Sequence, residues 1–264
     1  MTQDRPYSAL AAMGPNVAVA IGSHLETAFR SMASGQCVLN DSRFWRLLTG
    51  EPHPLGNLAL LSAAADVAVA SAAIEPLVSS ALPAAVLFPG IEVPADVHAH
   101  LVDRGFGLHG ALPAMAVDIP ELNDCSLPAG NEFVQVGDAD SDEWVRQFAI
   151  GYELPLGVAR CFAPSGPDDE DAAMQFFAVR KDGAIVGTSV CYLKNGVAGI
   201  YCVSTIASEP GKGLGAYATA EPLRIAARRG YGVGVLQSSE ARYSVYKRLA
   251  FKDFGGVPLY VRMP

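Results

Sequence analysis

The second half of the chain alternates between strand-like and helix-like patterns of hydrophobic and polar residues. Strand patterns occupy 131–138 and then 174–205, where turns at Asp182-Gly183 and Asn195-Gly196 predict two or three strands. Between them, Asp and Ser residues precede a helical spacing of apolar positions at 144, 148 and 152. The patterns then predict a helix ending at 229–230, a buried strand at 232–239, a helix at 240–251 and a last strand at 257–263.

The first half shows the same order of elements in a weaker form. A strand that begins near Asn57 precedes a helix from about 66 to 81, a second strand, a helix from about 95 to 104, and two further strands. The segment LVDRGF at 101–106 aligns with YKRLAF at 246–251, and the same offset of 145 residues aligns Asn57 with Cys202. This indicates an internal duplication, with two unrelated α/β segments as the alternative. The predicted fold class is α/β, with a mixed central sheet flanked by helices, in two domains at 1–130 and 131–264.

Composition and charge exclude several classes of protein. The chain has 264 residues, half of them apolar, and a formal net charge of −8. Residues 1–130 contain 12 acidic and 5 basic side chains, and 131–264 contain 15 and 14, so no basic surface for nucleic acid is expected. No apolar run reaches about 18 residues, and the start lacks the layout of a signal peptide. These features predict a cytoplasmic protein with no membrane partner.

Metal and disulfide chemistry are not expected either. The five cysteines are scattered and form no CxxC pair, which favours buried, reduced core residues. His98 and His100 lie two residues apart on a predicted helix and therefore do not share a face. No metal site is predicted.

Three alternating glycines stand where a predicted strand passes into a predicted helix. In IASEPGKGLGAYATAEPL they occupy positions 211, 213 and 215. Such a junction lets several backbone N–H groups converge at the positive end of the helix dipole, which suits a phosphate or pyrophosphate. A tight turn or a close helix contact is the alternative. The spacing excludes the dinucleotide fingerprint GxGxxG and the P-loop GxxxxGK[ST].

The region around this loop resembles a known family. VSTIASEPGKGLGAYATAEPLRIAARRGY, followed by VLQSSEARYSVYKRLAF, is similar to the signature of the GCN5-related N-acetyltransferase (GNAT) family, Q/R-x-x-G-x-G/A between a strand and a helix, with a tyrosine on a later helix. The resemblance extends over 131–264 and implies an acetyl-CoA-binding GNAT domain there. It implies a degenerate GNAT-like copy in 1–130, where 62–66 reads SAAAD, has no glycine, and is not expected to hold pyrophosphate.

The resemblance also assigns roles to individual residues. It implies that Val203 and Thr205 bind the pantetheine arm through their backbones, that Ser239 contacts the coenzyme, and that Tyr246 faces the thioester sulfur. The residues implied to hold the pyrophosphate of coenzyme A are Gly211, Lys212, Gly213, Leu214, Gly215 and Ala216. Pro210 stands where the family has Gln or Arg, so one N–H and one side chain are missing, which implies weaker coenzyme binding.

Direct acetyl transfer needs a neutral amine, a nearby carbonyl and a proton donor for the departing thiolate. Tyr246 is the predicted donor, with a core tyrosine as the alternative. Glu153 is the predicted base, with Glu209 and a water chain as alternatives; each carboxylate also fits a solvated surface position. Residues 131–264 contain no histidine, so a nucleophilic Cys-His pair is not available there.

The sequence therefore predicts an acetyl-CoA-dependent N-acetyltransferase that acts on an amine of a small molecule or peptide by direct transfer in a ternary complex. The acidic first half and the acidic run at 168–171 favour a cationic acceptor, although that run also fits a solvated loop. A non-catalytic acyl-CoA-binding regulatory protein and a scaffold that binds no coenzyme are the alternative functions. The acyl chain length and a homodimer stay open.

Overall fold

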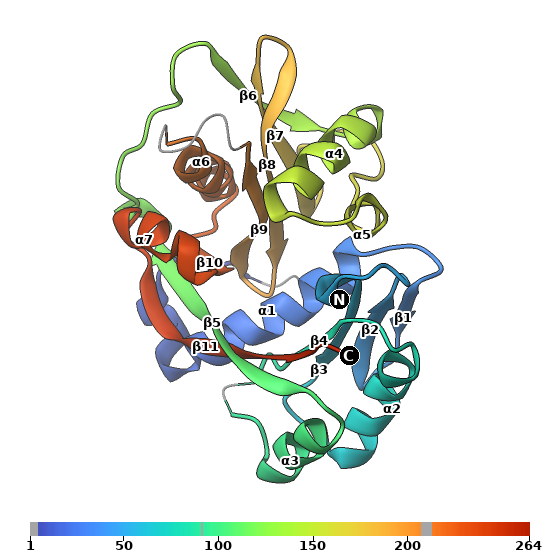
Figure 1. Ribbon diagram of the computed structural model, residues 1–264. Helices are drawn as coiled ribbons and strands as arrows, with labels where there is room; N and C mark the ends of the chain where they lie inside the picture. The colour runs from blue at the N-terminus through green and yellow to red at the C-terminus, as the bar shows by residue number, and fades with distance from the viewer. Residues whose placement is uncertain (1–4, 91, 207–212) are drawn as a thin grey trace.

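The computed structural model describes residues 5–90, 92–206 and 213–264, and these residues form one large mixed β-sheet (Figure 1). Its strand order is β1-β2-β3-β4-β11-β5-β10-β9-β8-β7-β6. The strands are β1 (Val38–Asn40), β2 (Phe44–Leu48), β3 (Asn57–Leu61), β4 (Ala84–Leu87), β5 (Gly107–Asp118), β6 (Asn131–Val136), β7 (Met174–Lys181), β8 (Ala184–Lys194), β9 (Val197–Thr205), β10 (Val233–Gln237) and β11 (Lys252–Arg262). The predicted mixed sheet flanked by helices is confirmed.

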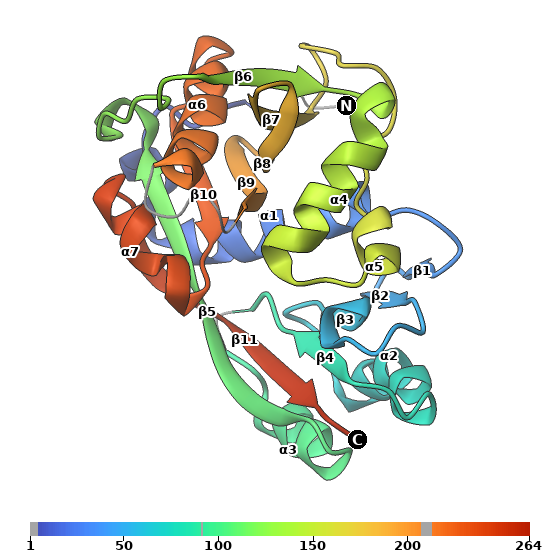
Figure 2. The same ribbon diagram turned by 45° about the horizontal axis from the view of Figure 1, so that its top comes forward.

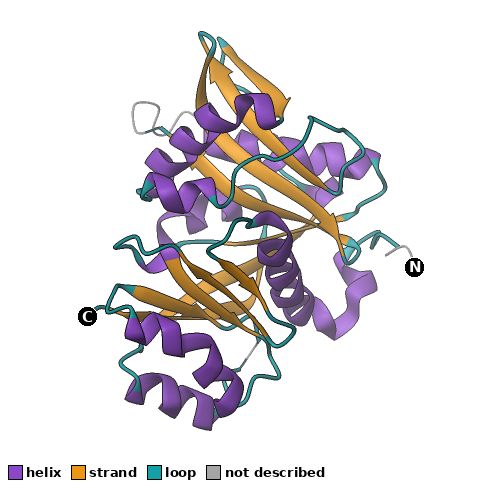
Figure 3. Ribbon diagram, turned by 90° about the vertical axis from the view of Figure 1, so that its right-hand side faces the viewer, coloured by secondary structure: helices purple, strands orange, loops and turns teal. Residues whose placement is uncertain are grey.

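Helices cover both faces of this sheet. They are α1 (Val17–Met32), α2 (Val67–Ser79), α3 (Ala95–Asp103), α4 (Ser141–Tyr152), α5 (Leu156–Arg160), α6 (Leu214–Arg228) and α7 (Glu240–Arg248). Helices α4 and α6 lie on opposite sides of β7, β8 and β9, whereas α2 and α3 lie together beside β3, β4 and β5 (Figures 1 and 2). Figure 3 shows the two ends of the sheet one above the other. No helix within the described ranges is long and apolar enough to cross a membrane.

The last strand of each half lies next to strands of the other half. Strand β5 pairs antiparallel with β10, where Ala116 faces Val235. Strand β11 pairs antiparallel with β4, where Leu259 faces Leu87, and also with β5. The sheet is therefore continuous across residue 130, which falls in the connection between β5 and β6. The division of the chain into domains at 1–130 and 131–264 stays a prediction.

The spacing of elements repeats between the two halves. Helices α3 and α7 are each nine residues long and begin 145 residues apart, and β5 and β11 begin with the same offset. The prediction of two strands after α3 was wrong, because β5 is one strand of 12 residues. Gly110 and Pro113 lie within this strand and face Leu259 and Gly256, where the ladder between β5 and β11 shifts register. An irregular ladder accommodates a glycine and a proline that a regular one would not.

The largest apolar cluster contains residues from both halves. The fully buried Trp45 on β2 belongs to it, as does the fully buried Trp144 on α4. Phe29 on α1 joins the two halves here, with its ring centroid 5.3 Å from that of Trp45 and 5.9 Å from that of Phe162. Since burial of such large rings is a main source of stability, the two halves stabilise each other.

Helix α1 contributes a buried histidine to the junction of the halves. The fully buried His24 is hydrogen-bonded through Nδ1 to the hydroxyl of Tyr201 on β9, at 2.7 Å. A Cβ atom on Gly199 would lie 2.2 Å from the His24 ring, so only glycine permits this approach. Burial lowers the pKa of His24 to about 4, and the ring is therefore neutral at pH 7.

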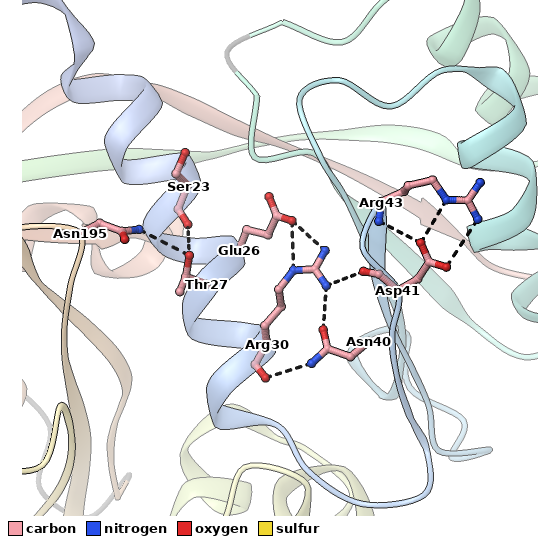
Figure 4. A network of polar contacts seen from close by, with 8 residues as sticks. All are labelled: Ser23, Glu26, Thr27, Arg30, Asn40, Asp41, Arg43 and Asn195. Carbon is pink, nitrogen blue, oxygen red and sulfur yellow. Dashed lines mark hydrogen bonds and ion pairs between the residues drawn. The ribbon is translucent and has the colours of Figure 1, made fainter. Parts of the chain in front are cut away.

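Polar contacts fasten α1 to the strands on either side of it (Figure 4). The Arg30 guanidinium donates to Asn40 Oδ1 and to the Asp41 carbonyl, both at 2.7 Å, next to the hairpin of β1 and β2. Asn195, in the turn between β8 and β9, donates to Thr27 Oγ1 at 3.5 Å. Helix α1 is thus anchored to elements of both halves.

Candidate active site

Strands β9 and β10 are paired at one end only, and this opens the centre of the sheet (Figure 1). They pair in parallel at Ala198 with Gly234 and at Gly199 with Val235. Beyond Gly199, β9 continues to pair with β8 as far as Thr205, whereas its registered pairs with β10 have ended. The open edge of β9 therefore carries backbone N–H and C=O groups that neither neighbouring strand satisfies, and such groups need a partner.

Val203 and Thr205, which were predicted to bind pantetheine, present their backbone groups to this opening. The Ile206 N–H donates to the Val186 carbonyl on β8 at 3.1 Å. Because the direction of hydrogen bonding alternates along a strand, Ser204 also faces β8, and Val203 and Thr205 face the opposite edge. Their N–H and C=O groups are thus available to an extended polar ligand.

A bulge in β9 lies at the start of this open edge. Cys202 and Val203 together stand opposite the single residue Ser189 of β8. Cys202 takes a left-handed conformation, with a φ of 51°. Because a bulge bends its strand and increases the local twist, it helps β9 to diverge from β10.

The N-terminus of α6 has unused backbone donors. Gly213 precedes the helix with a φ of 82°, and no side chain of the described residues caps this end. The Tyr217 N–H donates to the Gly213 carbonyl at 3.0 Å, as the first bond of the helix among the described residues. The N–H groups of the preceding turn have no such partner in the helix. They belong to the predicted pyrophosphate-binding residues Leu214, Gly215 and Ala216.

This helix end lies beside the open edge of β9. A Cβ atom on Gly215 would lie 3.8 Å from Thr205 Cγ2. The positive end of the helix dipole and its free N–H groups therefore stand next to the strand that offers its backbone, and the two together fit an elongated anionic ligand. The other residues of the predicted loop lie outside the described residues: Glu209, Pro210, Gly211 and Lys212.

Tyr246 on α7 is buried behind the same opening. Its ring packs edge-on against Phe251 with centroids 5.9 Å apart, and its hydroxyl lies beside the side chain of Thr219 on α6. The Thr219 hydroxyl in turn donates to the Gly215 carbonyl at 2.8 Å. Burial raises the pKa of Tyr246 to about 12, so the phenol keeps its proton at neutral pH.

The other predicted coenzyme contact lies at the start of α7. Ser239 is exposed and is the residue immediately before the helix, and its carbonyl accepts a hydrogen bond from the Tyr243 N–H at 3.0 Å. The exposed Arg242 lies one turn before Tyr246, and its positive charge acts on both Tyr246 and Tyr152. The start of α7 therefore supplies a hydroxyl and a cation near the opening.

Glu153, the predicted base, lies at the end of α4. It is exposed and has a left-handed φ of 55°. It lines an open groove of about 360 Å³ formed by residues of α4, of α5 and of the turn between them. The groove residues are Arg146, Ala149, Ile150, Glu153, Leu154 and Leu156. The groove therefore combines a carboxylate and a guanidinium, from Glu153 and Arg146, with apolar side chains.

The acidic run at 168–171 lies at the other end of α6. Arg229, which follows the helix, donates to the backbone carbonyls of Glu170 and Asp171 at 3.1 and 2.9 Å. A helix of 15 residues is about 22 Å long, so this run is distant from the uncapped N-terminus of α6.

Two residues that the sequence analysis did not assign to the site are part of it. The Thr219 hydroxyl donates to the first turn of α6, and Tyr152 ends α4 next to Gly151, which packs closely on Ser204 of β9. Helical spacing placed Tyr152 on the apolar face of α4 together with Phe148. The hydroxyl groups of Thr219 and Tyr152 were the signals in the sequence that could have revealed them, because a polar atom on an otherwise apolar face needs a partner.

Among the described residues, neither potential metal ligands nor cysteines form a second candidate site. No group of three or more His, Cys, Asp or Glu residues suited to a metal ion occurs in the described part of the chain. The five cysteines are free; Cys161, Cys191 and Cys202 are buried, and Cys37 and Cys125 are half-buried. Cys37 Sγ and Cys161 Sγ, from the two halves, are 3.3 Å apart.

Comparison of sequences finds no relative: no protein-family model matches the chain, and no curated protein matches it. Comparison of structures finds proteins of the same fold. A GCN5-related N-acetyltransferase from Kribbella flavida has a TM-score of 0.59 at 21% identity, covering 96% of this chain and 97% of its own. Another from Sphaerobacter thermophilus has a TM-score of 0.54 at 13% identity, covering 94% and 93%.

A third similar structure has two GNAT units in one chain. It is a tandem GNAT protein from the clavulanic acid biosynthesis pathway, with a TM-score of 0.52 at 13% identity and 97% of each chain covered. The predicted resemblance is thereby confirmed at the level of the fold, and this chain shares the fold of the tandem protein along 97% of its length.

Proposed function

We propose that this protein is an acetyl-CoA-dependent N-acetyltransferase whose active site lies in the second half of the chain. The observation that carries the proposal is the uncapped N-terminus of α6 beside the open edge of β9. This pairing of an anion site with an unpaired strand fits a ligand that joins a pyrophosphate to an amide-containing arm. Coenzyme A has that construction.

In the proposed complex, each part of the coenzyme has its own contacts. The N–H groups of Leu214, Gly215 and Ala216 bind the pyrophosphate, and the backbones of Val203 and Thr205 bind the pantetheine arm. Gly211, Lys212 and Gly213 extend the phosphate loop, and Ser239 contacts the coenzyme at the start of α7. The uncapped helix end and the direction of the β9 amides support these assignments.

Bound acetyl-CoA supplies an acetyl thioester, and transfer to an amine requires removal of a proton from the amine and delivery of a proton to the sulfur. Tyr246 holds a proton at its phenol oxygen and is the proposed donor to the sulfur. Glu153 is the proposed base and accepts the proton of the amine. No acyl-enzyme is needed, because both substrates are bound at once in this scheme.

The acceptor is proposed to be an amine of a small molecule or peptide that enters along the groove on α4 and α5. Glu153 supplies a negative charge there beside the positive charge of Arg146, and Ile150 and Leu156 supply apolar surface. A cationic amine with an apolar substituent fits these groups better than a polyamine without one.

The proposal is tested by the thermal midpoint of the protein with acetyl-CoA, with NADH and ATP as controls. A ligand at 100 times its Kd stabilises the folded state by about 2.7 kcal/mol, which corresponds to several degrees. A rise with acetyl-CoA alone is the expected result and would justify a screen of amines by release of free thiol. No shift at millimolar acetyl-CoA would contradict the proposal.

A further inference from the structure

Two opposite charges flank the apolar part of the groove on α4 and α5. Arg146 and Glu153 are both exposed, and neither side chain makes a hydrogen bond or an ion pair with another described residue. Arg160, at the end of α5, is by contrast paired with the Asp142 carboxylate at 2.9 Å. The guanidinium of Arg146 and the carboxylate of Glu153 are therefore available to a ligand in the groove.

These charges lie at the two ends of one stripe along α4. Arg146, Ile150 and Glu153 follow one another at helical spacings, and Ile150, which lies between the charges, is 61% exposed. The rise of the helix separates Arg146 from Glu153 by about 10 Å along its axis. Long side chains on a helix lean toward its N-terminus, so the Arg146 guanidinium is directed away from Glu153. A ligand that meets both charges must therefore be elongated.

The Glu153 end of this stripe is the one near the open edge of β9. Helix α4 has its C-terminal end toward β9 (Figures 1 and 2). Gly151 approaches the strand so closely that a Cβ atom on it would lie 2.4 Å from Ser204 Cβ. Two residues of chain span at most about 7 Å, so Glu153 is close to this contact. An acceptor bound along the stripe thus has its Glu153 end toward the proposed position of the thioester.

We propose that the acceptor is a short apolar peptide of two or three residues, whose N-terminal amine lies at Glu153 and whose C-terminal carboxylate pairs with Arg146. This inference rests on the proposed function. An extended chain spans about 3.3 to 3.6 Å per residue, so two or three residues match the separation of the charges. A free amino acid carries both charges on one carbon atom and is too short. Apolar side chains of the peptide lie against Ile150 and Leu156.

An N-terminal amine also suits the chemistry of this site better than a lysine side chain. The pKa of an α-amino group is about 8, against about 10.4 for lysine, so a far larger fraction is neutral at pH 7 to 8. Little is then required of an exposed carboxylate as the base. In the proposed step the amine nitrogen bonds to the acetyl carbon and the C–S bond breaks. Glu153 accepts the amine proton, Tyr246 gives its proton to the sulfur, and the products are an N-acetylated peptide and coenzyme A.

The test compares acceptors that differ in one charge. Release of free thiol from acetyl-CoA gives kcat/KM for the dipeptide Leu-Leu, for its C-terminal amide and for free leucine. The intact protein is expected to use the dipeptide about 3- to 5-fold better than the amide, as one partly exposed ion pair provides, and to use leucine least. In Arg146→Ala the ratio of dipeptide to amide is expected to fall to about 1, and Arg146→Lys should keep part of it. Arg160→Ala, which removes a guanidinium that is already paired, is the matched control and should keep the full ratio.

The position of the acetyl group gives a second readout. Mass spectrometry of the product formed from Leu-Lys-Leu is expected to find the acetyl group on the N-terminal nitrogen and not on the lysine side chain. Calorimetry of acetyl-CoA and the thermal midpoint should give the same values for Arg146→Ala as for the intact protein. An effect on peptide selection alone separates a contact with the acceptor from a structural effect.

The outcomes distinguish the two hypotheses. Binding of acetyl-CoA without acetylation of Leu-Leu overturns the inference and leaves the proposed function standing. Equal use of the dipeptide and its amide by the intact protein also overturns it, as does a preference for the dipeptide that survives in Arg146→Ala. If the intact protein does not bind acetyl-CoA, the proposed function itself fails, and the inference fails with it.

Discussion

The Asp66 carboxylate accepts a hydrogen bond from the Val69 N–H at 2.8 Å and so caps the start of α2. Helix α6 of the second half has Gly213 before it and no side-chain cap from the described residues. A carboxylate at a helix N-terminus both uses an N–H group and places a negative charge at the positive end of the dipole. In the first half, the Asp66 carboxylate therefore occupies the N-terminus of α2. In the second half, the N-terminus of α6 has no such carboxylate among the described residues and can accept an anion.

A carboxylate placed at the N-terminus of α6 is expected to abolish the binding of an anion there. Gly213→Asp should raise the Kd of acetyl-CoA about tenfold or more, because the new charge repels the pyrophosphate. Calorimetry measures the change. Gly213→Asn has nearly the same shape and tolerates the left-handed conformation, so it serves as the control and should bind more tightly than the Asp variant. Equal Kd values for the two variants would show that charge at this helix end is irrelevant.

Removing the Tyr246 hydroxyl is expected to impair transfer more than binding. Tyr246→Phe should lower kcat about 100-fold with an amine found in the screen, and should leave the Kd of acetyl-CoA within about threefold. Steady-state kinetics and calorimetry separate the two effects. Turnover equal to that of the unaltered protein would count against Tyr246 as the proton donor.

Ionisation of Tyr246 should not affect the rate of acetyl transfer below about pH 11. Burial raises the pKa of this phenol to about 12, so its proton is present throughout the range from pH 6 to 10. Any fall in kcat between pH 8 and 10 must then come from another group. A decline in that range that disappears in Tyr246→Phe would contradict this prediction.

The buried His24 is expected to make stability depend on pH. Its pKa is lowered to about 4 in the folded protein, against 6.5 for the free side chain, so the unfolded chain binds more protons between these values. Stability is complete above pH 6.5 and is lost as the pH falls toward 4. The free energy of unfolding should be about 2 kcal/mol lower at pH 5 than at pH 7 because of this group. Urea unfolding at both pH values measures it, with His24→Gln as a control that should lack this part of the slope.

Cys37 and Cys161 are expected to join on mild oxidation. Their sulfur atoms are 3.3 Å apart, and only a small movement separates this from a disulfide. An azodicarboxamide oxidant would take two electrons and two protons from the thiols and become the hydrazine. Burial raises the pKa of Cys161 to about 12, so the reaction should begin at the half-buried Cys37.

The resulting cross-link would close a loop of more than 100 residues and stabilise the protein by up to about 5 kcal/mol. Mass spectrometry of peptides and the thermal midpoint measure the outcome, and Cys37→Ser is the control. Recovery of both thiols unmodified after oxidation would rule out the cross-link.

Local sequence patterns determined most of the elements. Asp182 and Asn195 have φ values of 50° and 53°, and each is followed by a glycine with positive φ, so the residues of the turns were sufficient to place the two hairpins. The helix after Gly213 was predictable in the same way, since an amphipathic period and a glycine-rich start are properties of neighbouring residues. The resemblance to the GNAT signature rested on the same stretch, and it pointed to the correct fold.

Only the tertiary structure decided which strands are neighbours. Nothing in the pattern of β5 or β11 specifies that each lies beside strands of the other half, because pairing depends on distant segments that compete for the same edge. The same contrast between local sequence patterns and tertiary packing applies to the candidate active site. The sequence placed Tyr152 and Phe148 on one helical face, but only the contact of Gly151 with Ser204 shows how closely the end of α4 approaches β9. A local pattern determines which face of a helix is apolar, but how closely that face approaches a strand depends on packing across the whole fold.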